Sequence, residues 1–158
     1  MAVALGCYEK SESPAAQIQY EMGNAIELAI ANGLKQRFAL DDPDRYVHGL
    51  ELELDGITGN LDLLDVKDFA VEDVKLTKKS LRHDIDSDKF WYNWAQVKSY
   101  CCMIGSNIGR LHLVYVMGNY KFDPNDPLSG WQYRLWEDRW TKSELDAWWR
   151  IMVGHKRT

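Results

Sequence analysis

Three short apolar segments lie close together between two helix-like segments, and this order constrains the fold more than any other feature of the chain. Leu50 to Leu54 alternates Leu-Glu-Leu-Glu-Leu, the period of a strand that is buried on one side. Leu61 to Val66 and Ala70 to Thr77 predict a second and a third strand, and Gly56 and Gly59-Asn60 supply turns. Strands this close in sequence usually pair with their neighbours, so the sequence predicts a three-strand meander.

Helices are predicted on both sides of the meander. Ser13-Pro14 is typical of a helix N-terminus, and this helix is predicted to run through Ala31 and to end at Asn32-Gly33. The later elements are predicted to be a helix at Phe90 to Ile104 ended by Gly105, strands at Leu111 to Met117 and Trp131 to Trp140, and a helix that begins with the capping box Thr141-Lys142-Ser143-Glu144, runs through Val153 and ends at Gly154. A meander followed by a helical crossover predicts an α/β fold with a mixed central sheet flanked by helices. The length of 158 residues suits a single domain.

Composition excludes several classes of site. No run of 18 apolar residues is present, so no membrane span is expected. Cys101 and Cys102 are adjacent on a predicted helix, which disfavours a disulfide between them, and no Cys-x-x-Cys spacing indicates a zinc site. This cysteine usage fits a reducing, intracellular setting best.

The charged residues are unevenly distributed. The net charge is −5, whereas nucleic-acid-binding proteins are usually electropositive. Acidic side chains concentrate between positions 41 and 73, and the basic residues Lys75, Lys78, Lys79 and Arg82 follow directly. An acidic block before a basic block suits a metal site beside a surface that binds nucleic-acid phosphates. The other interpretation is an ordinary solvated hairpin and loop.

The acidic block contains the most informative motif of the chain, Asp62 followed by Asp73-Val74-Lys75. The period of two in a strand places Asp73 and Lys75 on one face of the third predicted strand. Asp62 reaches the same place if the second and third strands form a hairpin. Two carboxylates suit Mg²⁺ or Mn²⁺ better than zinc, and a lysine can stabilise the charge on a phosphate. The other interpretation is a surface salt bridge between Asp73 and Lys75.

Two other aspartates compete with Asp62 for this role. Asp55 stands just before Gly56 and is expected in a turn. Asp65 has the opposite parity to Asp62, so it is expected to face away from Asp62 in a regular strand. Asp62 is therefore the preferred partner of Asp73.

On these residues the chain resembles the PD-(D/E)xK nuclease superfamily, and within it the RecB-type branch that includes viral exonucleases and CRISPR-associated RecB-like nucleases. The resemblance rests on the order of the elements and on Gly59-Asn60-Leu61-Asp62 and Asp73-Val74-Lys75, and it covers roughly residues 13 to 117. It implies a restriction-endonuclease-like core and a DNA nuclease that depends on Mg²⁺ or Mn²⁺. Asp62, Asp73 and the backbone carbonyl of Val74 would be metal ligands, and Lys75 would assist the attacking water and the phosphate.

The resemblance extends to two of the predicted helices. Gln96 and Tyr100 have the spacing of a glutamine and a tyrosine in the branch, which implies that Gln96 orients the lysine and the water and that Tyr100 contacts the nucleic acid. Glu27, four residues after Gly23, would be a third metal carboxylate. The chain differs from the family in three ways: Leu61 stands where the family name has proline, Glu27 replaces the histidine of the branch, and no cysteine follows Cys102, so no iron–sulfur cluster is expected.

The implied activity is that of an exonuclease on DNA ends, with 5′-phosphate products, in viral or mobile-element recombination, repair or replication. The alternatives are a structure-specific endonuclease and a non-catalytic nucleic-acid-binding or assembly module on the same fold. No Walker-type loop is present, so a helicase or recombination partner is expected to be a separate chain. A homo-oligomer is the other assembly considered.

Seven tryptophans are a further unusual feature. Aromatic rings can stack on unpaired bases. The helical spacing of Trp91 and Trp94, however, predicts that both belong to the core. Trp148 and Trp149 point to different sides of the last predicted helix, so one of them is expected at the surface, where it could serve a subunit contact.

Overall fold

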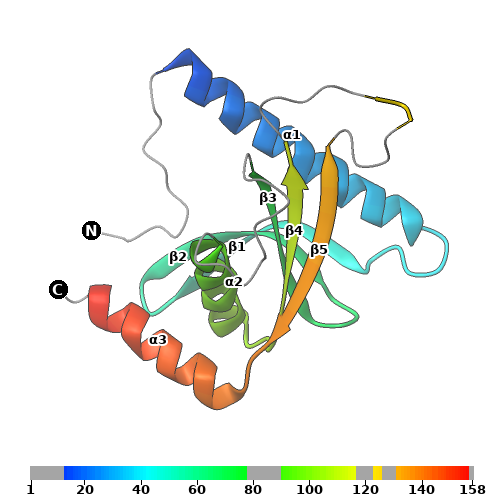
Figure 1. The fold of residues 1–158 in the computed structure, drawn as a ribbon. Coiled ribbons are helices and arrows are strands. Elements are labelled where there is room, and N and C mark those ends of the chain that lie inside the picture. The colour runs from blue at the N-terminus through cyan, green and yellow to red at the C-terminus, as the bar shows by residue number, and fades with distance from the viewer. Residues whose placement is uncertain (1–12, 78–89, 117–122, 126–130, 157–158) are drawn as a thin grey trace.

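The structure is a computed structural model that describes residues 13–77, 90–116, 123–125 and 131–156. Its elements are α1 (Pro14–Arg37), β1 (Tyr46–Leu54), β2 (Ile57–Asp65), β3 (Ala70–Thr77), α2 (Trp91–Ile104), β4 (Ile108–Tyr115), β5 (Gln132–Arg139) and α3 (Lys142–Lys156). Figure 1 shows that α1 lies on one side of the sheet, whereas α2 lies on the other side, with α3 next to it.

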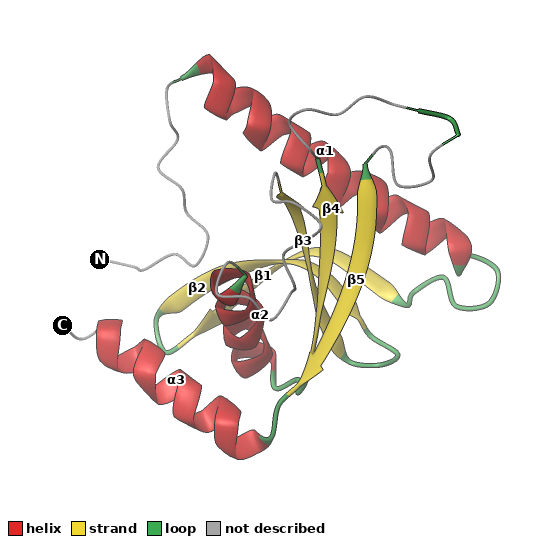
Figure 2. Ribbon diagram, in the orientation of Figure 1, coloured by secondary structure: helices red, strands yellow, loops and turns green. Residues whose placement is uncertain are grey.

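The strands form one sheet in the order β1-β2-β3-β4-β5 (Figure 2). The pairs β1–β2, β2–β3 and β4–β5 are antiparallel, and β3–β4 is parallel. A parallel pair requires a crossover connection, and α2 lies in the connection between β3 and β4. The predicted α/β class, with a mixed central sheet flanked by helices, is therefore confirmed.

Two hydrophobic clusters hold the helices on opposite faces of the sheet. The larger cluster joins α2 and the sheet through buried residues such as Leu61, Val71 and Leu111, and Leu145 of α3 packs against it. The smaller cluster contains Ala31 of α1 and Val74 of β3. Val71 and Val74 differ by three positions, so the alternation along β3 sends them to opposite faces. β3 is thus buried between helices on both sides.

The turn between β1 and β2 has the geometry that its sequence favours. Asp55 and Gly56 both have positive φ, at 51° and 70°, as the two central residues of a type I′ hairpin turn do. Asp55 is therefore a turn residue, as predicted. The last helix holds this turn, because Trp149 Nε1 donates to Asp55 Oδ2 at 2.7 Å and Lys156 Nζ donates to the Asp55 carbonyl at 2.8 Å.

Several boundaries differ from the sequence-based expectation. α1 does not end at Asn32-Gly33 but continues to Arg37, because Leu34 packs against the smaller cluster and extends the buried face of the helix. α3 continues through Gly154 to Lys156, whose side chain reaches Asp55. Backbone pairing begins earlier than expected in three strands: β1 begins at Tyr46, β2 at Ile57 and β4 at Ile108. β4 ends at Tyr115, before the expected Met117, which lies outside the described residues. β3 has the predicted bounds.

Two expectations from composition can be compared with the structure. Within the described part of the chain, no helix is long and apolar enough to cross a membrane. Cys101 and Cys102 both lie in α2 and carry free thiols. Burial raises the pKa of the Cys101 thiol to about 12, which keeps the thiol protonated at neutral pH.

Candidate active site

The hairpin of β2 and β3 brings Asp62 next to the Asp73-Val74-Lys75 motif. Backbone pairing joins Asp65 to Ala70, Leu64 to Val71 and Leu63 to Glu72. One step further along β2, the Asp62 side chain takes part, because its Oδ2 accepts the backbone N–H of Val74 at 2.8 Å. The predicted convergence of Asp62 with this motif is thus present in the structure.

Asp73 is a buried carboxylate with an incomplete set of hydrogen-bond partners. Its side chain is 0% exposed, and Lys75 Nζ lies 3.0 Å from Oδ2 and donates to Oδ1 at 3.3 Å. The contact with Oδ2 is too oblique for a hydrogen bond, and Oδ2 has no hydrogen-bond partner among the described residues. Within the described structure, Oδ2 is thus held by the charge of Lys75 alone, and a buried carboxylate oxygen that accepts no hydrogen bond is suited to an incoming cation or donor.

The three charged groups of the site perturb one another. Burial and the charge of Asp73 raise the pKa of Asp62 to about 8, against the opposing effects of Lys75 and of the Val74 N–H. Burial alone would lower the pKa of Lys75, but the charges of Asp73 and Asp62 outweigh it and raise that pKa. Two carboxylates therefore share one fixed positive charge. A second positive charge at this place would relieve the repulsion between them.

This repulsion predicts a pH-dependent stability in the presence of a chelator. The folded pKa of Asp62, about 8, lies above its ordinary value of 3.8, so the folded state binds the extra proton between these values. The contribution of Asp62 to stability is complete below the lower value and is lost as the pH rises through the upper one. Asp62→Asn keeps an oxygen for the Val74 N–H, and it is expected to be more stable than the wild type at pH 9 by at least about 1.4 kcal/mol, one pKa unit.

Denaturant unfolding at pH 5 and pH 9, both in EDTA, measures this effect. Asp62→Asn is expected to lose less stability than the wild type between the two pH values. Asp146→Asn is the matched control, because Asp146 forms an exposed pair with Lys142 and such pairs contribute little. An Asp62→Asn protein with the same pH dependence as the wild type would contradict the raised pKa.

Glu27 lies within electrostatic reach of Asp62, but its side chain contacts His48. Its Oε1 is 2.9 Å from His48 Nε2 of β1, and its charge contributes to the raised pKa of Asp62. The described residues contain no group of three or more histidine, cysteine, aspartate or glutamate side chains arranged to hold a metal ion. The role of Glu27 as a third ligand stays a prediction. His48 is a residue that the sequence pattern does not single out, because its contact depends on how α1 packs against β1.

The residues present fit a divalent metal with few protein ligands. Magnesium is often held by one or two carboxylates and keeps several waters. Asp73 Oδ2 is a buried oxygen without a hydrogen-bond partner in the described part of the chain, and Asp62 is close enough to raise the electrostatic cost of leaving both carboxylates charged. These two aspartates are the side chains that would hold the metal, and the role of the Val74 carbonyl stays a prediction.

Gln96 and Tyr100 approach the site from α2. Gln96 Nε2 donates to the Tyr100 hydroxyl at 2.9 Å. Burial raises the pKa of Tyr100, and the charges of Asp73 and Lys75 also act on that pKa, which places the phenol within electrostatic reach of both residues. Tyr100 is 1% exposed, so it belongs to the core, whereas the sequence-based expectation has it contact nucleic acid. The reason is that its ring packs closely over Gly59.

A side chain at position 59 is expected to displace Tyr100. An added Cβ would lie 2.5 Å from Cε1 and 3.2 Å from Cδ1 of that ring. Gly59→Ala is therefore expected to lower the free energy of unfolding by about 1–3 kcal/mol, the usual effect of overpacking. Gly33→Ala is the matched control, since an added Cβ there would meet nothing within 4 Å in the described structure, and alanine favours a helix by roughly 0.5–1 kcal/mol. Denaturant unfolding compares the two variants, and equal stability of Gly59→Ala and wild type would refute the close contact.

A second group of charged side chains lies away from Asp73. The buried Glu72 accepts from Arg110 at 2.8 Å and lies 2.6 Å from His112 Nε2. Asp65 accepts from Arg45 and Arg110, at 2.7 Å and 2.8 Å. Asp65 therefore belongs to this network, whereas Asp62 accepts the Val74 N–H. This network has its oxygens paired, unlike Asp73, and this pattern is typical of a structural role.

The basic residues predicted to bind nucleic acid cannot be placed. Lys78, Lys79 and Arg82 lie outside the described residues. Of the basic block, only Lys75 belongs to the described part of the chain. Its Nζ contacts Asp73, and the charge of Asp62 also raises its pKa. The predicted roles of the other three stay predictions.

The α/β fold of the sheet and its helices is shared with proteins of known structure. The crystal structure of a phage-related exonuclease from Haemophilus somnus 129PT matches 93% of this chain with a TM-score of 0.58 and 14% sequence identity, and the match covers 71% of that protein. The crystal structure of SSO0001 matches 89% of this chain with a TM-score of 0.51 and 15% identity, and the chain spans 61% of its length. No protein-family model matches the sequence, and no curated protein sequence is significantly similar to it. At these identities the likeness establishes the fold.

Proposed function

We propose that this chain is a divalent-metal-dependent DNA nuclease, and that it acts as an exonuclease on DNA ends. The observation that carries the proposal is the buried Asp73 carboxylate, which has an oxygen without a hydrogen-bond partner in the described structure and lies next to Asp62 and Lys75. The fold supports it, since a phage-related exonuclease shares that fold. A virus or mobile element is the proposed setting, and DNA is the proposed partner.

Asp62 and Asp73 would hold Mg²⁺ or Mn²⁺, and Glu27 would join them if it leaves His48. When bound, the metal supplies positive charge for the phosphate and lowers the pKa of water. Lys75 keeps its proton because the carboxylates raise its pKa, so it presents a fixed positive charge to the phosphate. Asp62 also holds the Val74 N–H, which fixes the backbone between Asp73 and Lys75. Gln96 and Tyr100 support this arrangement from α2.

The assay that tests the proposal uses purified protein with Mn²⁺ or Mg²⁺ and four DNA substrates: linear and circular, each single- and double-stranded. An exonuclease requires an end, so linear DNA is expected to be degraded to 5′-phosphate products and circular DNA to stay intact. Cleavage of circular DNA would show that the activity is that of an endonuclease. If no substrate is cleaved with either metal, the proposed nuclease activity is contradicted.

One observation favours a second candidate, a non-catalytic DNA-binding or assembly module. Glu27 is engaged by His48, and within the described residues the carboxylates do not form a group of three. A module of this kind is expected to give no heat on titration with Mn²⁺, whereas the nuclease is expected to bind the metal. A separate helicase or recombination protein, or a second copy of the chain, would be the partner in either case.

A further inference from the structure

Two large aromatic side chains are exposed at the start of α2. Trp91 is 63% exposed and Tyr92 is 52% exposed, and their rings form a T-shaped pair with centroids 5.7 Å apart. The sequence-based expectation that Trp91 belongs to the core is therefore wrong. Trp94 does pack against the larger cluster and forms an edge contact with Trp140. Core packing thus accounts for Trp94 and not for the pair that precedes it.

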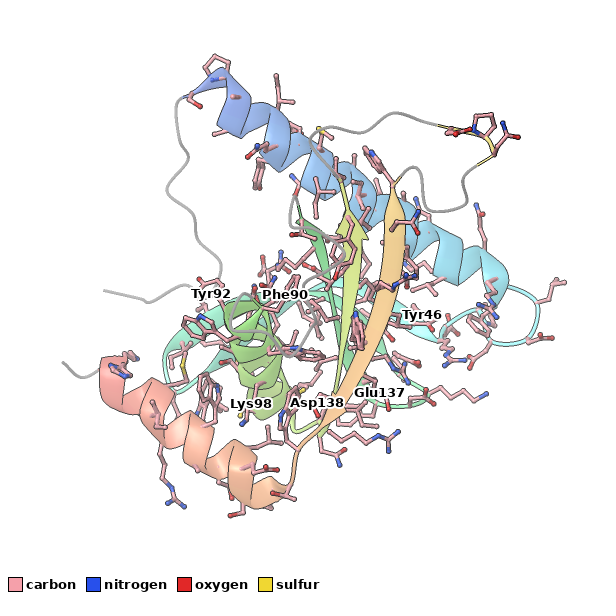
Figure 3. All side chains as sticks on the ribbon, in the orientation of Figure 1. Tyr46, Phe90, Tyr92, Lys98, Glu137 and Asp138 are labelled. Atoms are coloured by element: carbon pink, nitrogen blue, oxygen red, sulfur yellow. The ribbon has the colours of Figure 1, made fainter. Side chains whose placement is uncertain are left out.

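Tyr92 lies on the same stripe of α2 as two residues of the candidate active site, and Trp91 is its neighbour in the chain. Tyr92, Gln96 and Tyr100 are spaced four residues apart, which places them on one face of the helix. Gln96 donates to Tyr100, whose phenol is within reach of the charges of Asp73 and Lys75. A rise of 1.5 Å per residue places Tyr92 about 12 Å from Tyr100 along the axis, a few nucleotides along a strand. Figure 3 labels Tyr92 and Phe90 at the beginning of α2 and Lys98 further along.

The chemistry of the two rings favours nucleic acid as the partner of this surface. Every base of a nucleic acid has a flat face that can stack on an aromatic ring, and this stacking tolerates any base sequence. The proposed function supplies the same partner, because it places a DNA strand at Asp73 and Lys75.

We propose that Trp91 and Tyr92 form a stacking platform for unpaired bases, and that the substrate strand of the proposed nuclease is single-stranded DNA. This inference rests on the proposed function for the position of the strand, with its phosphate at Asp73 and Lys75. Bases in a duplex are stacked on one another and offer no free face along the strand, so the platform selects unpaired DNA.

The test separates stacking from cleavage by using Asp73→Asn protein in EDTA. The probes are oligonucleotides with 2-aminopurine at successive positions near one end, either single-stranded or in a duplex. Stacking of the probe base on a ring quenches its fluorescence. Quenching is expected for the single strand within a few nucleotides of the end. Trp91→Ala and Tyr92→Ala are each expected to weaken single-strand binding by about 5- to 150-fold. Tyr92→Phe keeps a ring and is expected to restore most of the affinity lost in Tyr92→Ala.

Trp131→Ala is the matched control, because Trp131 is also exposed, at 50%, but lies outside α2; it is expected to bind like the parent. Equal binding of single-stranded and duplex DNA, or unchanged binding by Trp91→Ala and Tyr92→Ala, would overturn the platform. A change from dimer to monomer in those variants, without a change in DNA binding, would assign the surface to a second copy and also overturn it. Cleavage by the wild type without fluorescence quenching would contradict the stacking platform and leave the proposed nuclease activity standing. Quenching without cleavage would contradict the nuclease activity and leave the platform standing.

Discussion

Replacing Asp73 with asparagine is expected to abolish metal-dependent DNA cleavage, with a loss of at least about 10³-fold in rate, the size of effect that a strong electrostatic contact at a reacting centre has. Asparagine has nearly the same shape but no charge, so it removes the buried carboxylate whose Oδ2 has no hydrogen-bond partner among the described residues. The folded protein is expected to persist in EDTA, because the substitution also removes the repulsion between Asp73 and Asp62.

The measurement is initial cleavage rate on end-labelled linear DNA with saturating Mn²⁺. Unfolding in EDTA on the same samples shows that the variant is folded. Asp146→Asn, an exposed carboxylate paired with Lys142, is expected to cleave like the wild type. Cleavage by Asp73→Asn within tenfold of the wild type would place the reaction away from the hairpin of β2 and β3.

Replacing Lys75 with methionine is expected to reduce both activity and stability. The cleavage rate is expected to fall by about 10²–10³-fold, because the positive charge beside the phosphate is lost. The stability in EDTA is expected to fall by about 2–3 kcal/mol, less than the ~3–5 kcal/mol for breaking a fully buried pair, since the Lys75 side chain is 30% exposed. Asp62 and Asp73 would then have no cation between them.

A metal titration distinguishes this role of Lys75 from a structural one. Mn²⁺ restores part of the missing positive charge, so it is expected to stabilise Lys75→Met more than it stabilises the wild type. The thermal midpoint is measured with EDTA and with Mn²⁺ for the wild type, Lys75→Met and the matched control Lys142→Met, whose lysine is 88% exposed. A Lys75→Met protein that Mn²⁺ stabilises no more than the control would argue against a shared charge at this site.

The bounds of an element could be predicted from the sequence where neighbouring residues alone determine them. The sequence predicts β3 with the bounds it has, and it predicts the end of α2 at Gly105, which has a left-handed φ of 81°. Gly33 and Gly154 carry the same stop signal, yet both helices continue through them. The difference lies in tertiary contacts made after the glycines, by Leu34 and Lys156, which no local pattern contains.

The residues of the candidate site also fall into two groups, those that local geometry predicts and those that depend on tertiary packing. Asp62, Asp73 and Lys75 could be brought together from parity and a hairpin, because both follow from strand geometry. The contact of Glu27 with His48 could not be predicted, since it depends on where α1 crosses β1. The exposure of Trp91 likewise depends on packing: helical spacing predicts a face, and only the packed structure determines which positions the sheet covers.

Asp62 and Asp73 repel each other although Lys75 lies beside them, and this repulsion is the physical basis of the proposed function. The neighbouring network of Glu72, His112 and Arg110 shows that the fold can pair buried charges fully. At Asp62 and Asp73 it instead leaves two carboxylates with one lysine and an acceptor that lacks a hydrogen bond in the described structure. Perturbed groups of this kind are concentrated at functional sites.

Calorimetric titration of Mn²⁺ into metal-free protein tests this account most directly. The wild type and Asp146→Asn are expected to bind Mn²⁺ with measurable heat, and Asp62→Asn and Asp73→Asn are expected to lose that binding while remaining folded. No heat with the wild type, or the same affinity in the wild type and Asp73→Asn, would contradict the assignment of these two aspartates as the metal site.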